Sequence, residues 1–229
     1  MKEESVSVKQ AKKALFYLIV QYQTDKIEAE RTIQMGNGNR GNTMIIKNGL
    51  VFTPEGKFEK KDFYIEGEYV AKETTDNKEV EAEGCYVIPG LVDIHFHGCV
   101  RHDMCDGTEE SIQALADYEA ANGVLAICPA TMTIPEEELF QAMNAAREHK
   151  NGKGADLVGI NMEGPFVNKE KKGAQKEEDI KLADVELFHK LQEAAGGLIK
   201  LVDLAPETEG AMDFINQVKD EVHVSIAHT

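Results

Sequence analysis

Two histidines one residue apart, His95 and His97, are the residues of this chain whose type and spacing best suit metal chemistry. They lie at the end of an apolar run, residues 91–96, that is predicted to form a buried strand after the break at residues 89–90. Side chains two positions apart in a strand point to the same face, so both imidazoles would be directed at one point. Paired imidazoles suit zinc, iron, nickel or copper. The alternative is that the two histidines only form hydrogen bonds in a turn.

Two further candidate ligands follow later apolar runs. Glu163 comes directly after residues 158–162 and before a rigid Gly-Pro turn, and a carboxylate in such a place usually has a partner. His228 comes directly after residues 222–227. The alternatives are a solvated loop carboxylate and a disordered histidine. Since functional residues in barrels gather at the C-terminal ends of different strands, these two residues and the histidine pair predict one site for a divalent transition metal.

The segments around these candidate ligands alternate between strands and helices, which is typical of a parallel α/β sheet or barrel. Strands are predicted at residues 91–96, 124–130, 157–162, 199–204 and 222–227. Helices are predicted at residues 109–122 and 184–195, between Thr133 and the third strand, and from Thr208 to residue 220. A five-stranded open sheet is possible, but a doubly wound domain usually carries a Gly-rich ligand loop, and none appears. We therefore predict a partial TIM (β/α)8 barrel over residues 89–229, cut off after about five of its eight strands.

The preceding part of the chain has a different character. Residues 44–88 contain short β-like runs separated by polar turns, with one turn expected at Asn48-Gly49, and predict a small antiparallel unit that is part of a β-sandwich. Residues 1–43 combine a predicted helix at residues 9–33 with a Gly/Asn-rich stretch at residues 35–43. We expect this segment to be an N-terminal extension or linker, with Met44 as the natural start.

Composition disfavours several classes of function. The net charge of the 229 residues is −16, whereas nucleic-acid or anionic-membrane binding needs basic surface. The longest apolar run near the N-terminus, residues 14–20, is too short to span a bilayer. The cysteines form no CxxC pair and no secretory signal is evident, so reduced thiols and a cytoplasmic location are expected. Cys99 and Cys105 lie close after the histidine pair and could be ligands, although buried or loop thiols are the more frequent case.

From Met44 onward the chain resembles the N-terminal portion of the N-acetylglucosamine-6-phosphate deacetylase family, in the amidohydrolase superfamily. The matching motifs are PGLVDIHFHG, CPATMT, NMEGPF, KGAQ, LAPE and IAHT, which begin at residues 89, 128, 161, 172, 204 and 226. The first motif occurs widely among amidohydrolases, whereas EGPF followed by GAQ is far more specific. Many relatives use a carboxylated lysine after the fourth strand, where this chain has Ala205-Pro206-Glu207.

The resemblance implies a TIM barrel with a small β-sandwich and a site for one or two divalent ions, zinc or iron. It implies that Glu163 and His228 hold the principal metal, and that His95 and His97 hold a second metal in members that have one. A bound metal lowers the pKa of water and polarises an amide carbonyl. The implied reaction is hydrolysis of the N-acetyl group of N-acetylglucosamine 6-phosphate, which gives glucosamine 6-phosphate and acetate.

Other residues and partners are also implied by the resemblance. Ala174 and Gln175 match positions that contact the sugar phosphate, whereas Arg101 stands where the family usually has a glycine. The catalytic aspartate of the family is expected after an eighth strand, beyond the C-terminus of this chain, so no catalytic residue is assigned. The partner is expected to be an N-acetylated amino-sugar phosphate, with no nucleic acid and no membrane, and the full-length form is expected to be a homo-oligomer.

The missing aspartate makes us expect a truncated form that is weak or inactive alone, with an exposed strand edge that favours self-association. Two alternatives to the deacetylase stay open. One is another amidohydrolase that cleaves a cyclic amide. The other is a non-catalytic fragment that binds metal or sugar phosphate.

Overall fold

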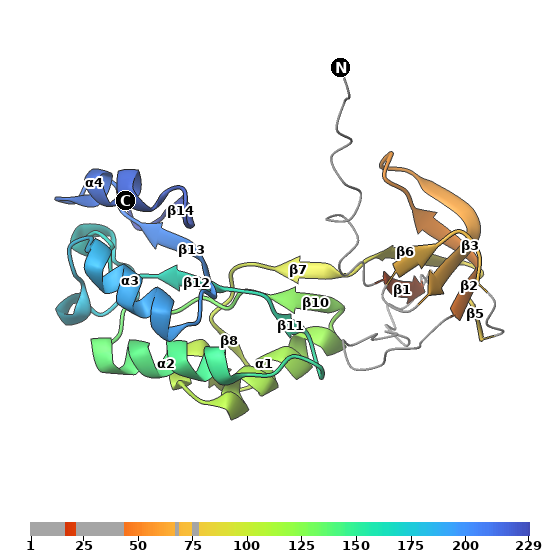
Figure 1. Cartoon of the computed structure of the whole chain (residues 1–229), viewed down its shortest axis with the longest axis horizontal. Helices are drawn as coiled ribbons and strands as arrows, with labels where there is room; N and C mark the ends of the chain where they lie inside the picture. Colours follow the sequence, from red (N-terminus) through yellow and green to blue (C-terminus); the bar gives the residue numbers. More distant parts are fainter. Residues whose placement is uncertain (1–16, 22–43, 67–68, 75–77) are drawn as a thin grey trace, which may run out of the picture. The chain divides into compact units, whose positions relative to one another are not determined.

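The computed structural model describes residues 17–21, 44–66, 69–74 and 78–229, which have a mixed α/β fold. The chain divides into two compact units (Figure 1). The first consists of Met1–Leu91 with Ala121–Leu125, and the second of Val92–Ala120 with Ala126–Thr229. The candidate metal ligands all belong to the second unit.

The first unit is built on a six-stranded sheet. Its main path runs β1-β6-β2-β3-β4, and β5 pairs with β2 beside this path. The strands are β1 (Tyr17–Gln21), β2 (Met44–Phe52), β3 (Phe58–Glu66), β4 (Tyr69–Ala71), β5 (Glu79–Glu81) and β6 (Cys85–Pro89). Alternate residues of β2, β3 and β6 point into one apolar cluster, as the period of a strand requires. Because β2 pairs in parallel with both β5 and β6, the prediction of a purely antiparallel unit is wrong.

Strand β2 runs straight through the position where a turn was predicted. Asn48 has a φ of 62° and the register with β3 shifts between Ile46 and Gly49, so these residues form a bulge rather than a hairpin turn. Asn tolerates the left-handed conformation, and its backbone N–H donates to Asp62 Oδ1 over 3.0 Å. A Cβ atom on Gly49 would lie 2.6 Å from Val87 Cγ2, so β6 packs where only glycine fits.

The helix predicted at residues 9–33 is wrong for Tyr17–Gln21, which form β1 and pair antiparallel with β6. The rest of that predicted helix, and the Gly/Asn-rich stretch at residues 35–43, lie outside the described residues. The described part of the expected extension therefore contributes a strand to the sheet of the first unit.

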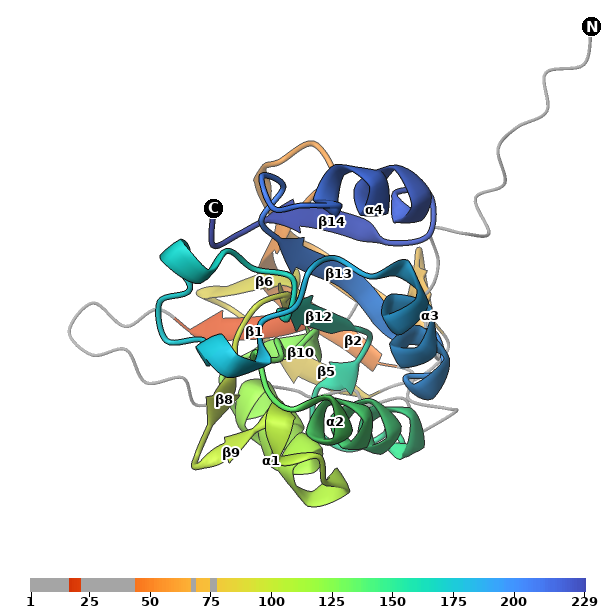
Figure 2. The same ribbon diagram turned by 90° about the vertical axis from the view of Figure 1, so that its left-hand side faces the viewer.

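From β7 onward the chain alternates parallel strands with helices, as predicted. The principal strands are β7 (Leu91–Asp93), β10 (Val124–Ile127), β12 (Ile160–Glu163), β13 (Ile199–Leu204) and β14 (His223–Ile226). The helices between them are α1 (Glu109–Ala121), α2 (Glu136–Glu148), α3 (Val185–Ala194) and α4 (Ala211–Val218). Figure 2 shows β12, β13 and β14 side by side.

The parallel strands form two three-stranded sheets, β11-β10-β7 and β12-β13-β14, where β11 is Asp156–Leu157. A parallel bridge between Ala130 and Asn161 joins the two sheets, so the five principal strands follow one another in chain order. Among the described strands, β7 pairs only with β10 and β14 pairs only with β13, so no closed barrel is formed. This part of the chain thus shows a parallel α/β arrangement that is open at both edges.

Shorter elements connect these strands and helices. A two-stranded ribbon is formed by β8 (Gly98–Cys99) and β9 (His102–Asp103), and the 3-10 helices are Met104–Asp106, Lys169–Lys171 and Glu177–Asp179.

Asp184 caps α3 by accepting from the backbone N–H groups of Glu186 and Leu187, as its residue type favours. Helix α2 has Pro135 at its N-cap position, and Thr133, from which this helix was predicted to follow, is buried. Within the described residues, no helix combines the length and apolar character needed to cross a bilayer.

Candidate metal site

The four predicted ligands meet at the carboxyl ends of three parallel strands. Glu163 is the last residue of β12, whereas His95 and His97 follow β7 and His228 follows β14. Glu163 Oε2 lies 3.0 Å from His95 Nε2 and 3.3 Å from His97 Nε2. Glu163 Oε1 lies 2.7 Å from His228 Nε2. Segments more than 60 residues apart in sequence therefore place three imidazole nitrogens around one carboxylate.

The contacts of Glu163 show why this carboxylate suits a cation. Its side chain is 6% exposed, and a buried carboxylate is costly unless it is paired. Oε2 is buried and has no hydrogen-bond partner. The Nε2 atoms of His95 and His97 lie close to it, but neither contact has the geometry of a hydrogen bond. One ligand atom each from His95, His97 and Glu163 lie within 4.8 Å of one another. This donor set of two imidazoles and a carboxylate fits a divalent metal ion such as zinc or iron.

His228 is oriented by a backbone carbonyl. Its Nδ1 lies 2.9 Å from the oxygen of Lys171, and because a carbonyl only accepts, Nδ1 must carry a hydrogen. With this hydrogen on Nδ1, the neutral ring has its lone pair on Nε2, whereas the 2.7 Å contact of Nε2 with Glu163 Oε1 is a hydrogen bond only in the protonated ring. Burial alone would lower the pKa of His228, but the hydrogen bonds with Lys171 and Glu163 raise it above the ordinary value. The ring is thus held in the orientation that a metal-binding histidine needs.

Gln175 forms part of the site in a way that the sequence did not reveal. Its side chain is buried, its Nε2 donates to Glu163 Oε1 over 2.8 Å, and its Oε1 accepts from the backbone N–H of Thr133 over 2.6 Å. Gln175 therefore fixes the rotamer of Glu163. Ala174, beside it, is exposed. The role of these two residues as substrate contacts stays a prediction.

Two polar residues near His95 were also missed by the sequence analysis. Asn161 on β12 places Nδ2 2.9 Å from His95 Nδ1, and Asp203 on β13 places Oδ2 3.4 Å from the same atom. Burial raises the pKa of Asp203, against the opposing effect of a hydrogen bond with Ser225. An aspartate between the apolar residues Val202 and Leu204 was the available signal, because a buried carboxylate usually has a structural or chemical partner.

The cysteines and Arg101 lie outside this constellation. All four cysteines are free, and in the described part of the chain none joins the His-His-Glu cluster. Burial raises the pKa of Cys105 to about 12, so its thiol stays protonated; its sulfur accepts from the backbone N–H of Met132. Arg101 is exposed in the turn of the β8–β9 ribbon, with a φ of 70°. This left-handed conformation favours glycine.

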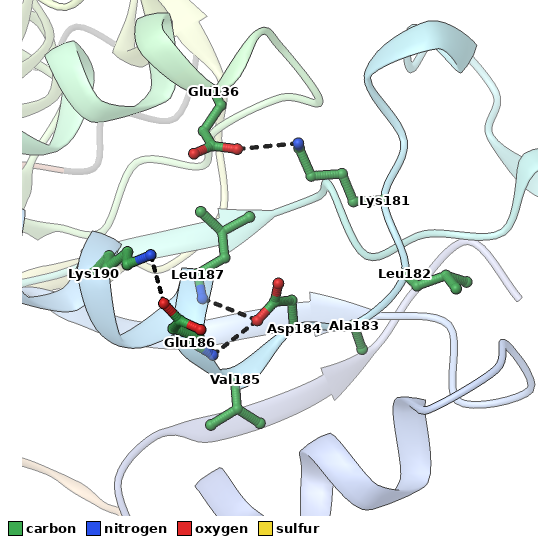
Figure 3. Close-up of a pocket in the computed structure, with 9 residues that line it drawn as sticks. All are labelled: Glu136, Lys181, Leu182, Ala183, Asp184, Val185, Glu186, Leu187 and Lys190. Atoms are coloured by element: carbon green, nitrogen blue, oxygen red, sulfur yellow. Dashed lines mark hydrogen bonds and ion pairs between the residues drawn. The ribbon is translucent and has the colours of Figure 1, made fainter.

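A separate cavity of about 730 Å³ lies at the start of α3 (Figure 3). Its two lysines are already paired, Lys181 with Glu136 over 3.0 Å and Lys190 with Glu186 over 2.7 Å. None of the candidate ligands lines this cavity. Because both cations are neutralised by carboxylates, the cavity has little attraction for an anionic substrate.

No family model matches the chain, but curated proteins do. An N-acetylglucosamine-6-phosphate deacetylase of Bacillus subtilis (strain 168) is 36% identical over 192 residues, which cover 81% of this chain and 47% of the relative. An N-acetylgalactosamine-6-phosphate deacetylase of Escherichia coli O157:H7 is 28% identical over 191 residues, which cover 82% of this chain and 51% of the relative. The chain thus spans about half the length of the curated relatives it matches.

Solved structures show the same partial match. An N-acetylglucosamine-6-phosphate deacetylase from Pasteurella multocida has a TM-score of 0.72 at 20% identity, with 82% of this chain and 51% of that chain covered. A mutant of the enzyme from Mycobacterium smegmatis, in complex with N-acetyl-D-glucosamine-6-phosphate, has a TM-score of 0.71 at 22% identity, with 82% and 50% covered. At these identities the likeness is one of fold.

Proposed function

Because this chain is a homologue of the N-acetylglucosamine-6-phosphate deacetylases, matched over about half of their length, we propose that it carries the metal-binding residues of such a deacetylase. The proposed reaction is hydrolysis of the N-acetyl group of an N-acetylated amino-sugar phosphate, N-acetylglucosamine 6-phosphate in the first instance. The observation that carries the proposal is the convergence of three imidazole nitrogens on the buried carboxylate of Glu163.

The proposed mechanism assigns a task to each residue of the site. Glu163 and His228 hold the principal metal, and His95 and His97 complete this site or hold a second ion. A bound divalent metal supplies a Lewis acid that acidifies water and polarises the amide carbonyl. Gln175 keeps Glu163 in place through its 2.8 Å hydrogen bond. We assign no general base to the residues of this chain.

The proposal also extends to the fold. The five principal strands are parallel and follow one another in chain order, and the candidate ligands lie at their carboxyl ends. Both features are those of a (β/α)8 barrel. We propose that these strands are the first five of such a barrel and that the sheet of the first unit is part of a sandwich. The choice of zinc or iron, homo-oligomer formation and a cytoplasmic location stay predictions.

Metal binding by the 229-residue chain tests the proposal directly. The chain is stripped with a chelator, and its zinc affinity is measured by competition with a chromophoric chelator. Glu163→Gln should lower the affinity at least about 100-fold, because it removes a ligand rather than a supporting residue. His189→Gln is the control, since His189 pairs with Glu221 on the surface, outside the site. Equal affinities of the parent and Glu163→Gln would overturn the assignment.

Substrate and reaction need a second assay. Acetate release from N-acetylglucosamine 6-phosphate and N-acetylgalactosamine 6-phosphate is measured on the protein isolated from its natural source and on the 229-residue chain. Turnover of either sugar by the natural protein, lost with Glu163→Gln, is the expected result. A metal-loaded natural protein that releases no acetate from either sugar would refute the proposed reaction.

A further inference from the structure

We propose that Asp203 is a positioning residue that accepts the Nδ1–H of His95 and thereby directs the Nε2 lone pair of this histidine at the metal. The inference rests on the metal-binding role proposed above for His95. It assigns a function to a buried aspartate that the proposed reaction leaves unused.

The strand register brings Asp203 to the site. Glu163 on β12 is the register partner of Asp203 on β13, which in turn is the partner of Ser225 on β14. Register partners on neighbouring strands point to the same face of a sheet, so Asp203 shares the face of Glu163. Its side chain is 3% exposed, and its Oδ2 lies 3.4 Å from His95 Nδ1. The carboxylate of Asp203 therefore approaches Nδ1 of the ring, whereas that of Glu163 approaches Nε2.

The second step concerns the hydrogen on the His95 ring. A neutral imidazole carries one N–H, so a ring that binds a metal through Nε2 must carry its hydrogen on Nδ1. Nε2 is the nitrogen that faces Glu163 Oε2, at 3.0 Å. Two side chains reach Nδ1, namely Asn161 through Nδ2 at 2.9 Å and Asp203 through Oδ2 at 3.4 Å. One of them must accept the hydrogen.

Asn161 is unsuited to this task because its amide orientation is fixed. Its Nδ2 also donates to the backbone oxygen of Ile94 over 3.2 Å, and a carbonyl cannot donate, so the group facing His95 is the NH₂. An NH₂ group only donates, so its 2.9 Å contact makes Nδ1 the acceptor in a ring without metal, and it cannot accept an Nδ1–H. A ring that binds a metal through Nε2 must therefore exchange this contact for one with Asp203, 3.4 Å away. Asp203 is a pure acceptor when ionised, and its Oδ1 is buried without a hydrogen-bond partner. Metal-binding histidines usually donate their second N–H to such a carboxylate, and loss of this partner typically lowers metal affinity 10- to 100-fold, about the effect expected here.

Zinc affinity of matched variants tests the proposal. Asp203→Ala should bind zinc about 10- to 100-fold more weakly than the parent. The zinc affinity of Asp203→Asn should lie between these two, because the amide Oδ1 can still accept the hydrogen of His95 Nδ1. Asp156→Asn changes another buried aspartate, on β11, and should leave the affinity unchanged. Thermal unfolding of each variant is measured to check that it is folded. If the parent binds no zinc, both the metal site and this inference fail; if the parent binds zinc and Asp203→Ala binds it equally well, only the role of Asp203 fails.

A spectroscopic measurement on the parent protein needs no variant. The ¹⁵N shifts of the His95 ring in the zinc-loaded, isotope-labelled chain should show a metal-bound Nε2 and a protonated Nδ1 whose hydrogen exchanges slowly. In Asp203→Ala that exchange should be faster, a change that a merely structural role would not cause. Zinc on Nδ1, or an Nδ1–H that exchanges equally fast in both proteins, would overturn the proposal.

Discussion

Replacing Gln175 by alanine should both destabilise the protein and weaken metal binding at the proposed site. The substitution removes the hydrogen bond that Nε2 donates to Glu163 Oε1 and leaves the backbone N–H of Thr133 without its 2.6 Å acceptor. A hydrogen bond to a charged group contributes about 1.5–3 kcal/mol, and an unsatisfied buried donor costs about 1–3 kcal/mol. Since the two losses share one side chain and are not additive, we expect the free energy of unfolding to fall by about 2–5 kcal/mol.

The assay is urea unfolding of the metal-free chain followed by circular dichroism at 222 nm, because the chain has no tryptophan to report the transition. Zinc affinity is measured on the same variant and should fall about 10- to 100-fold, as for other supporting residues of metal sites. Without Gln175 the Glu163 side chain can adopt more conformations. A bound ion must restrict these conformations, and this entropic cost lowers the affinity.

Gln192→Ala is a matched control. Gln192 on α3 also bridges backbone groups, since its Nε2 donates to the oxygen of Ile199 and its Oε1 accepts from the N–H of Ile199, each over 2.9 Å. This variant should be destabilised to a comparable degree but should bind zinc like the parent. If Gln175→Ala unfolds at the parent urea concentration and keeps the parent zinc affinity, the reasoning about Glu163 is refuted.

Further predictions concern the core, a cap, the metal and a thiol. Phe188→Ala should lower the free energy of unfolding by about 3–5 kcal/mol, measured with urea, because Phe188 is fully buried against Phe214. Asp184→Ala should cost about 1 kcal/mol in the same assay, since it removes the N-cap of α3. Zinc should raise the melting temperature of the parent, and EDTA should reverse this shift, whereas the shift should be much smaller for Glu163→Gln because its zinc affinity is lower. Cys105 should resist iodoacetamide at pH 8 in the folded chain and react after unfolding, because burial raises its pKa to about 12 and thiolate forms only as the pH approaches that value.

The order of the parallel strands could be predicted from the sequence because each is a short, mainly apolar run with clear ends. Residues 199–204 illustrate this, since the predicted strand and β13 coincide. The turn expected at Asn48-Gly49 failed for a different reason: the same residues suit a hairpin turn and a bulge, and only pairing with β3 and β6 decides between them. Residues 17–21 likewise have a helical pattern, but pairing with β6 makes them a strand.

For the site, the sequence predicted the candidate ligands but not the residues that orient them. His95, His97, Glu163 and His228 follow predicted strands, so the topology of a parallel sheet was enough to bring them together. The hydrogen bond between Gln175 and Glu163 depends instead on the path of an irregular loop, and the approach of Asp203 to His95 depends on the strand register. Neither is encoded in a local pattern of residue types.

The bridge at Asn161 has a consequence for how this sequence can change over evolutionary time. The backbone of Asn161 accepts from the N–H of Thr131 and donates to the oxygen of Pro129, and its side chain donates to the oxygen of Ile94 and contacts His95. Asn161 thus joins the two parallel sheets through its backbone and contacts the imidazole of His95 through its side chain. Any residue except proline can keep the backbone hydrogen bonds, so the restriction comes from the side chain, which must reach both Ile94 and His95. Drift at this position should therefore be slower than at Met162, whose buried side chain other apolar residues of similar volume can replace.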